Sequence, residues 1–215
     1  MKPFRLFSLF LLLLPMACST VRLESSYKDP DTVLFNANKL LVIGLTQDMG
    51  VREAFESRLQ EIFSDQGIET VRSIDVFDVE FTASERSEAE LDLVEQQLLE
   101  KDFDAILFTK VLGTETRTTL RRKIREIGES YDRFNEDYIL HQGVYYDRSY
   151  YELATDYYAE TSVYCICEGK ERNLIWRSVV LISEPRNTRQ AVKDFIELIT
   201  QNMTENQVLL GTEAF

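Results

Sequence analysis

Apolar runs alternate with helical patterns through the first half of this chain, and this alternation constrains the fold more than any other feature. Residues 38–47, NKLLVIGLTQ, form a near-continuous aliphatic run, which is typical of a strand covered on both faces. Residues 51–67 repeat an apolar residue at every fourth position, from Val51 to Phe63, as an amphipathic helix does. Asp48 is the expected N-cap of this helix.

The alternation continues with a predicted strand at 68–77, a helix at 84–103 and a strand at 103–113. Short crossovers between such elements produce a parallel sheet. The pattern then changes, because residues 151–167 and 173–183 predict two strands joined by a short polar connection, which is typical of an antiparallel hairpin.

We therefore expect one α/β domain over residues 38–205, with a mixed sheet of about five strands and helices packed on it. The order is β-α-β-α-β, a tyrosine-rich insert at 114–150, a β-hairpin and a C-terminal helix at 187–203. A short helix is predicted at 116–130 inside the insert, and 131–150 is expected to be irregular. Residues 206–215 are expected to be a C-terminal tail.

The chain begins with a pattern typical of a targeting segment. Lys2 and Arg5 precede the apolar run 6–14, which is far shorter than the roughly 20 residues that a membrane-spanning helix needs. Residues 1–17 are therefore expected to be a signal peptide. An ordinary cleaved signal with a cysteine beside its cleavage site would have the same layout.

The end of this segment resembles a bacterial lipoprotein signal, with Leu14 and Ala17 leading to Cys18. The resemblance implies that Cys18 carries a lipid anchor of several palmitate-like acyl chains, which holds the protein on a membrane. The next residue, Ser19, is not the aspartate linked to inner-membrane retention, so the resemblance implies the outer membrane. Either face of that membrane, periplasmic or cell surface, is compatible with it. Residues 18–37 lack sustained periodicity and are expected to be a lipid-anchored tether.

The chain is strongly acidic, with 24 basic and 37 acidic side chains and a net charge of -13. Loss of Lys2 and Arg5 with the signal peptide leaves 22 basic side chains against 37 acidic ones, a net charge of −15. Such a protein is not expected to bind nucleic acid or anionic lipid through bulk electrostatics.

The cysteines and the histidine predict neither a metal site nor a cofactor. Cys165 and Cys167 would point the same way from one strand, about 6.6 Å apart, which is poor geometry for a mutual disulfide. A C-x-C pair is also a fragment of some metal sites, but the chain has a single histidine, His141, and no second cysteine pair. We interpret the two cysteines as small buried hydrophobic residues.

Catalytic motifs are missing from the sequence. The turn after the first strand, TQDMGVRE, contains neither G-x-G-x-x-G nor a lysine-bearing phosphate loop, and no G-x-S-x-G elbow occurs. We expect no enzyme. The alternative is a hydrolase that uses two carboxylates in or near the insert. Seven are candidates: Asp132, Glu136, Asp137, Asp147, Glu152, Asp156 and Glu160.

Nine of the ten tyrosines lie between Tyr131 and Tyr164, and tyrosine is enriched in recognition surfaces. If 151–167 is one strand, odd positions face the helices and even positions face solvent, so Tyr150 and Tyr158 should be more exposed than Tyr151 and Tyr157. The candidate partner-binding residues are Tyr145, Tyr146, Tyr150 and Tyr158. Trp176 is expected in the core.

A basic cluster within 116–130 contains Arg121, Arg122 and Arg125 and is a weak candidate for an anion site. A solvated helix face paired with neighbouring carboxylates is the alternative interpretation.

Four stretches carry a likeness to a known group of proteins: KLLVIGL with the helix after it, FDAILFTKVLGTETR, the tyrosine-rich insert, and NLIWRS before a last helix. The chain resembles small bacterial lipoproteins of unknown function. Their architecture is similar to the N-terminal domain of the Tol-system propeller protein and to lipoproteins that activate penicillin-binding proteins or secrete curli.

This resemblance implies a non-enzymatic binding or assembly role at the cell envelope, with an envelope protein or polymer as partner. A homo-oligomer formed through an exposed edge strand is a further alternative.

Overall fold

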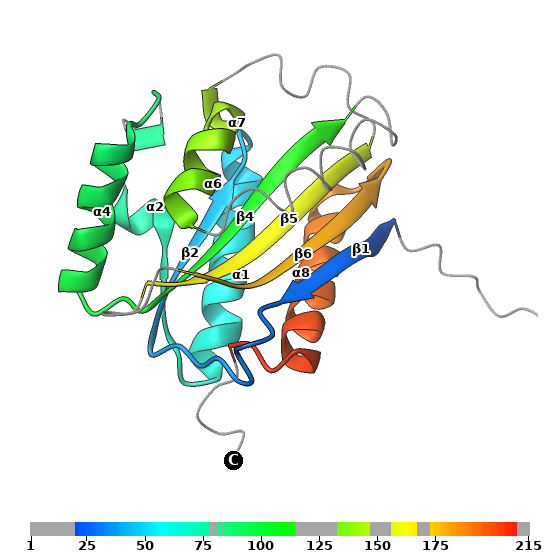
Figure 1. The fold of residues 1–215 in the computed structure, drawn as a ribbon. Coiled ribbons are helices and arrows are strands. Elements are labelled where there is room, and N and C mark those ends of the chain that lie inside the picture. Colours follow the sequence, from blue (N-terminus) through cyan, green and yellow to red (C-terminus); the bar gives the residue numbers. More distant parts are fainter. Residues whose placement is uncertain are drawn as a thin grey trace, which may run out of the picture.

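The computed structural model describes residues 20–77, 81–82, 84–114, 133–146, 156–166 and 173–209. Their centre is a six-stranded sheet in the order β1-β6-β5-β4-β2-β3 (Figure 1). The strands are β1 (Val21–Lys28), β2 (Lys39–Leu45), β3 (Glu69–Arg72), β4 (Ala105–Thr114), β5 (Asp156–Cys165) and β6 (Leu174–Ser183).

The predicted fold class, a single α/β domain with a mixed sheet, is confirmed. β2 pairs in parallel with both β3 and β4, as the two crossovers require. β4, β5 and β6 are antiparallel neighbours, so the predicted hairpin is present and extends the parallel half of the sheet. The predicted strand 68–77 is shorter than expected, because β3 ends at Arg72 and the helix α2 (Ser73–Val76) follows.

The sheet has one strand more than expected, and this strand comes from the segment interpreted as a tether. The expectation that 18–37 is a tether is wrong for β1, which pairs antiparallel with β6 along its length. The register of β1 shifts between Leu23 and Ser25. This irregularity breaks the period-2 alternation by which a strand is recognised in a sequence, and it explains why β1 was missed.

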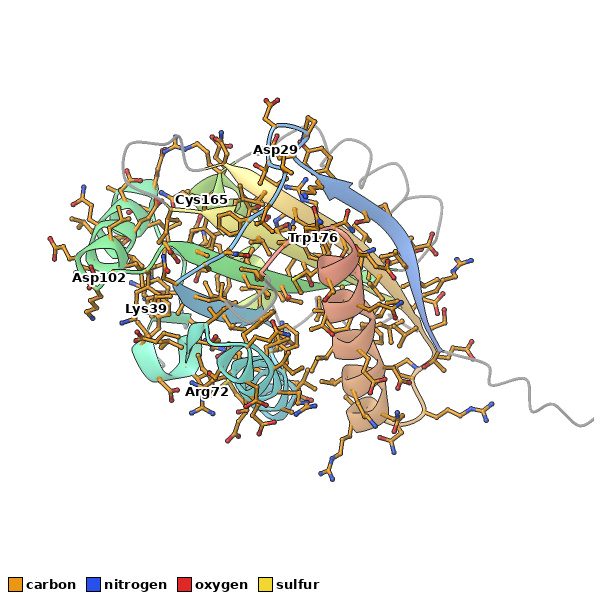
Figure 2. The ribbon with its side chains drawn as sticks, turned by 90° about the horizontal axis from the view of Figure 1, so that it is seen from below. Asp29, Lys39, Arg72, Asp102, Cys165 and Trp176 are labelled. Atoms are coloured by element: carbon orange, nitrogen blue, oxygen red, sulfur yellow. The ribbon has the colours of Figure 1, made fainter. Side chains whose placement is uncertain are left out.

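Helices cover both faces of the sheet (Figures 1 and 2). One face carries α1 (Met49–Asp65) and α8 (Thr188–Glu205), and the other carries α4 (Glu88–Glu100) and α6 (Phe134–His141). The predicted N-cap Asp48 of α1 is confirmed, and the structure also shows Ser87 as the cap of α4 in a capping box and Asn187 as the cap of α8.

Each face of the sheet has its own hydrophobic core. The core under α1 and α8 includes Leu59 and Trp176, which is fully buried as expected and is labelled in Figure 2. The core under α4 and α6 includes Phe108, Phe134 and Tyr164, and the ring of Phe134 contacts each of the other two edge to face. Both sides of β4, β5 and β6 are therefore largely covered.

The second core corrects the expectation for the insert. Residues 131–150 were expected to be irregular, but 134–146 form α6 and the short helix α7 (Gly143–Tyr146). Phe134 and Tyr138, one helical turn apart, supply the buried side of α6. The predicted helix 116–130 lies outside the described residues.

The expected C-terminal tail also joins the fold. Val208 and Leu209 are buried, and Val208 forms a parallel bridge with Phe35. The backbone N–H of Leu209 donates to the carbonyl oxygen of Phe35 at 2.7 Å. The prediction that 206–215 is a tail is therefore wrong as far as Leu209.

Candidate functional site

A cleft of about 570 Å³ opens between α1 and α8 at the carboxyl ends of β2 and β4. In open α/β sheets, ligands are commonly bound at this edge, and the volume lies in the usual range for small-ligand pockets. The floor includes Thr109 and Ala159 from the sheet, and the walls include Val51 and Phe55 from α1 and Val192 from α8. No sequence motif marks this cleft, and it was not predicted.

The close approach of α1 to β2 shapes one wall of the cleft and depends on Gly44. A Cβ atom at position 44 would lie 3.2 Å from Cδ1 of Phe55 and 3.5 Å from Cγ of Arg52. The N–H of Gly44 donates to Oε1 of the buried Glu56 at 2.9 Å. A larger residue would therefore push α1 away from the sheet.

Among the described residues, the walls of the cleft are mainly apolar, and the two charged side chains that line it are both engaged. The Oδ1 atom of Asp48 accepts the N–H of Val51 at 3.0 Å as the cap of α1. The guanidinium of Arg52 donates to Glu56 at 3.0 Å and to Ser73 at 2.7 Å. Neither Asp48 nor Arg52 is therefore available for acid–base chemistry in the cleft, because both already make structural hydrogen bonds.

Glu56 and Arg52 belong to a buried polar cluster behind the cleft. Oε1 of Glu56 also accepts the hydroxyl of Ser73 at 2.6 Å, and Oε2 accepts the N–H of Ile74 at 3.1 Å. The guanidinium carbon of Arg52 lies 5.3 Å from the centre of the Tyr145 ring. These contacts hold α1, the β3–α2 turn and α7 together.

A second buried polar cluster lies on the opposite face, between α6 and the sheet. The ammonium of Lys110 contacts the carboxylates of both Asp137 and Glu160, and its distance to Oε1 of Glu160 is 2.9 Å. Nε of Arg177 lies 3.3 Å from the same oxygen of Glu160. All four side chains are at least nine-tenths buried, and their formal charges balance.

Asp137 is the centre of this second cluster. The hydroxyl of Tyr164 donates to its Oδ2 at 2.6 Å, and Nδ1 of His141 lies 2.9 Å from its Oδ1. Burial alone would raise the pKa of Asp137, but the ammonium of Lys110 and the hydrogen bond from His141 outweigh burial and lower that pKa to about 2. Burial and the nearby carboxylate raise the pKa of Tyr164 well above its ordinary value.

The structure separates the tyrosine candidates. Tyr146 is 40% exposed, whereas Tyr145 is partly buried and donates from its hydroxyl to the carbonyl oxygen of Gly44 at 3.3 Å. Tyr158 is only 2% exposed, so its predicted outward orientation is wrong. The reason is α6, which covers the even face of β5 that was expected to meet solvent. Tyr150 lies outside the described residues.

The odd positions of β5 face α1 and α8, as predicted, through Ala159, Val163 and Cys165. Tyr157 lines the cleft and is more exposed than Tyr158. The prediction that Tyr158 is the more exposed of the two is therefore wrong. The predicted difference in exposure between Tyr150 and Tyr151 concerns two residues outside the described ones.

The candidates for lipidation, anion binding and hydrolysis lie in different parts of the chain. Cys18 and the basic candidates Arg121, Arg122 and Arg125 lie outside the described residues. Among the hydrolase carboxylates, Asp137 and Glu160 meet in the buried cluster, and Glu136 is exposed. No group of three potential metal ligands occurs within the described ranges.

Cys165 corrects the interpretation of the cysteines. It is buried, as expected, but it is disulfide-bonded rather than a free thiol, and its partner lies outside the described residues. None of the helices in the described part of the chain is both long and apolar enough to cross a membrane.

Comparison with known proteins finds weak structural likeness at low identity. No family model and no curated protein matches the chain. Among solved structures, the PelC dodecamer from Paraburkholderia phytofirmans is similar at 10% identity and a TM-score of 0.41, over 87% of this chain and 98% of that chain. A PelC variant from the same organism gives 11% and 0.39, over 87% and 97%. At these scores the likeness carries no argument about function.

Proposed function

We propose that this protein is a lipid-anchored component of the bacterial cell envelope that acts by binding rather than by catalysis, with the cleft between α1 and α8 as its binding site. The observation that carries this proposal is the cleft itself, a preformed apolar cavity of about 570 Å³ whose charged side chains are both engaged. Such a cavity suits an apolar ligand or partner segment, and its described lining offers no unengaged charged group for acid–base chemistry.

The proposed anchor is an acylated Cys18, and the proposed destination is the outer membrane because Ser19 follows it. The disulfide at Cys165 supports an envelope location, since disulfides persist in oxidising compartments and are rare in the bacterial cytosol. With Cys18 acylated, the partner of Cys165 is Cys167, and the objection from one-strand geometry does not apply because β5 ends at Cys165. We also propose membership of the small bacterial lipoproteins that the sequence resembles.

The hydrolase alternative is weaker than binding. Asp137 and Glu160 are the candidate carboxylates that the fold brings together, but both are nearly fully buried and each contacts Lys110. A glycosidase needs its carboxylates at a surface that a sugar can reach. Their place beneath α6 favours a structural role.

The edge-pairing alternative is also weaker. β1 is an edge strand of the sheet, but its register shifts between Leu23 and Ser25, and it carries Arg22, Glu24 and Lys28. Bulges and charged side chains are features that prevent edge strands from pairing with other chains.

The anchor is tested by expressing the full chain and its Cys18→Ser variant in a Gram-negative host fed an alkyne-bearing palmitate analogue. We expect the wild type to carry the label on Cys18, to be cleaved before this residue and to sediment with outer membranes on a density gradient. The variant should lose the label and the sedimentation together. An unlabelled wild-type chain in the soluble fraction would overturn the proposed anchor.

A further inference from the structure

The N-terminal end of the folded domain lies close to the proposed anchor. The carbonyl oxygen of Thr20 accepts the N–H of Ser183 at 2.8 Å, and Val21 pairs with Ile182 at the start of β1. Cys18 precedes Thr20 by two residues, so its Cα lies within about 7 Å of the Cα of Thr20. Instead of standing at the end of a long tether, the domain is attached almost directly to its anchor.

The cleft opens at this same end of the sheet. Asp156 pairs with both Thr114 and Ser183, which places the end of β4, the start of β5 and the end of β6 together with the start of β1. Ile182, the partner of Val21, is itself part of the cleft wall. An anchored domain therefore holds the cleft next to the membrane surface.

The chemistry of the cleft favours a hydrocarbon chain over an anionic group. Two helices begin beside it, and in each the cap side chain already accepts one of the N–H groups that an anion would use, because Val51 donates to Asp48 and Gln190 donates to Asn187. The apolar wall residues Val51 and Val192 are partly exposed. Met49, at the start of α1, is 56% exposed.

We propose that the cleft binds one acyl chain of a phospholipid from the membrane in which the protein is anchored. This inference rests on the proposed function, because it requires Cys18 to hold the domain at the bilayer. A bilayer lipid is the chosen occupant because membrane lipids surround an anchored domain in large excess, whereas a chain of the anchor that entered the cleft would no longer help to hold the protein on the bilayer.

The test uses the full, acylated chain in phosphatidylethanolamine vesicles that contain a phospholipid with a diazirine on its acyl chain. After irradiation, mass spectrometry maps the labelled peptides. We expect label on the segments around Val51 and Val192, which form the two walls. Label confined to segments away from the cleft would overturn the proposal.

Matched variants separate binding in the cleft from general contact with the bilayer. Val51→Asp combined with Val192→Asp should reduce the label at least about ten-fold, because a carboxylate in the walls disfavours a hydrocarbon chain. Val192→Phe, which keeps the wall apolar but fills the cleft, should reduce it as well. Leu93→Asp combined with Leu140→Asp is the control on the opposite side, where both residues are more than half exposed, and should leave the label unchanged.

Two further measurements distinguish the sources of failure. If the protein is purified from cells fed a diazirine fatty acid and reconstituted in unlabelled vesicles, only the anchor carries the diazirine. A cross-link from Cys18 to the cleft would then show that the anchor's own chain is the occupant and would overturn the choice of a bilayer lipid. An intact-mass spectrum without acyl groups on Cys18 would instead refute the proposed function. Urea midpoints close to wild type in all three variants would confirm that loss of label is not loss of folding.

Discussion

Replacing Lys110 with methionine removes the cation that two buried carboxylates share, while nearly preserving the volume of the side chain. Asp137 and Glu160 both contact its ammonium, and the distance to Glu160 is 2.9 Å. At this distance one pair attracts by about 6 kcal/mol with an effective dielectric constant of about 20. Relief of the ammonium's own desolvation offsets part of this loss, so we expect Lys110→Met to cost about 3–5 kcal/mol of folding free energy.

A second substitution in the same cluster, Asp137→Asn, tests whether the loss of folding free energy in Lys110→Met is electrostatic. Asp137→Asn alone leaves an excess buried positive charge and should also destabilise the fold. Together, Lys110→Met and Asp137→Asn restore neutrality and leave Arg177 paired with Glu160 at 3.3 Å. We expect the double variant to be at least about 2 kcal/mol more stable than the sum of the single losses predicts.

A matched control tests the pairing itself. Lys110→Met with Glu160→Gln has the same net charge, but it removes the carboxylate that Arg177 contacts, so it should recover less stability than Lys110→Met with Asp137→Asn. Urea unfolding of the chain starting at Ser19, followed by circular dichroism, gives all the free energies. Strict additivity of Lys110→Met and Asp137→Asn would refute the view that these charges stabilise one another.

Three other outcomes are expected. The carboxylate of Asp137 has a folded-state pKa of about 2, below its ordinary value of 3.8, so its stabilisation is complete above pH 4 and should fall by about 2 kcal/mol as the pH drops to 2, measured as urea midpoints across that range. Gly44→Ala should cost about 1–3 kcal/mol in thermal or urea unfolding because of the contact with Phe55, whereas an unchanged midpoint would show that α1 can shift freely. Ending the chain after Glu205 should lower the thermal midpoint by several degrees relative to ending it after Leu209, and equal midpoints would argue against a structural role for the last described residues.

Local patterns predicted most of the elements of the fold. The β-α-β-α-β order, the hairpin, the last helix and the cap of α1 follow from periodicity and capping chemistry, both of which act within a few residues. β1 could not be found in this way, because its shifted register removes the alternation and its place depends on pairing with β6, about 150 residues away. The cleft depends on the approach of α1 and α8, which no local pattern encodes.

The tyrosine-rich region shows why the candidate site was misplaced. Alternation on β5 was interpreted as one buried and one exposed face, and this would hold for a sheet covered on one side. The helix α6 covers the second side, and its own aromatic residues Phe134 and Tyr138 were interpreted as part of an irregular segment. The two tyrosines therefore lie on opposite faces of the sheet, Tyr158 in the core under α6 and Tyr157 at the cleft.

One signal for this second interior was present in the sequence. Lys110 and Arg177 are each a single cation within an otherwise apolar strand, in AILFTKVLG and LIWRSVV. A cation buried in a strand requires a carboxylate on the neighbouring strand or on a covering helix. Glu160 lies directly opposite Lys110 in the β4–β5 register, and Asp137 descends from α6 to meet the same ammonium. A charged residue such as Glu160 on the even face of β5 therefore indicates that this face is exposed to solvent only when the neighbouring strands carry no opposite charge. Here both neighbours carry one, Lys110 on β4 and Arg177 on β6.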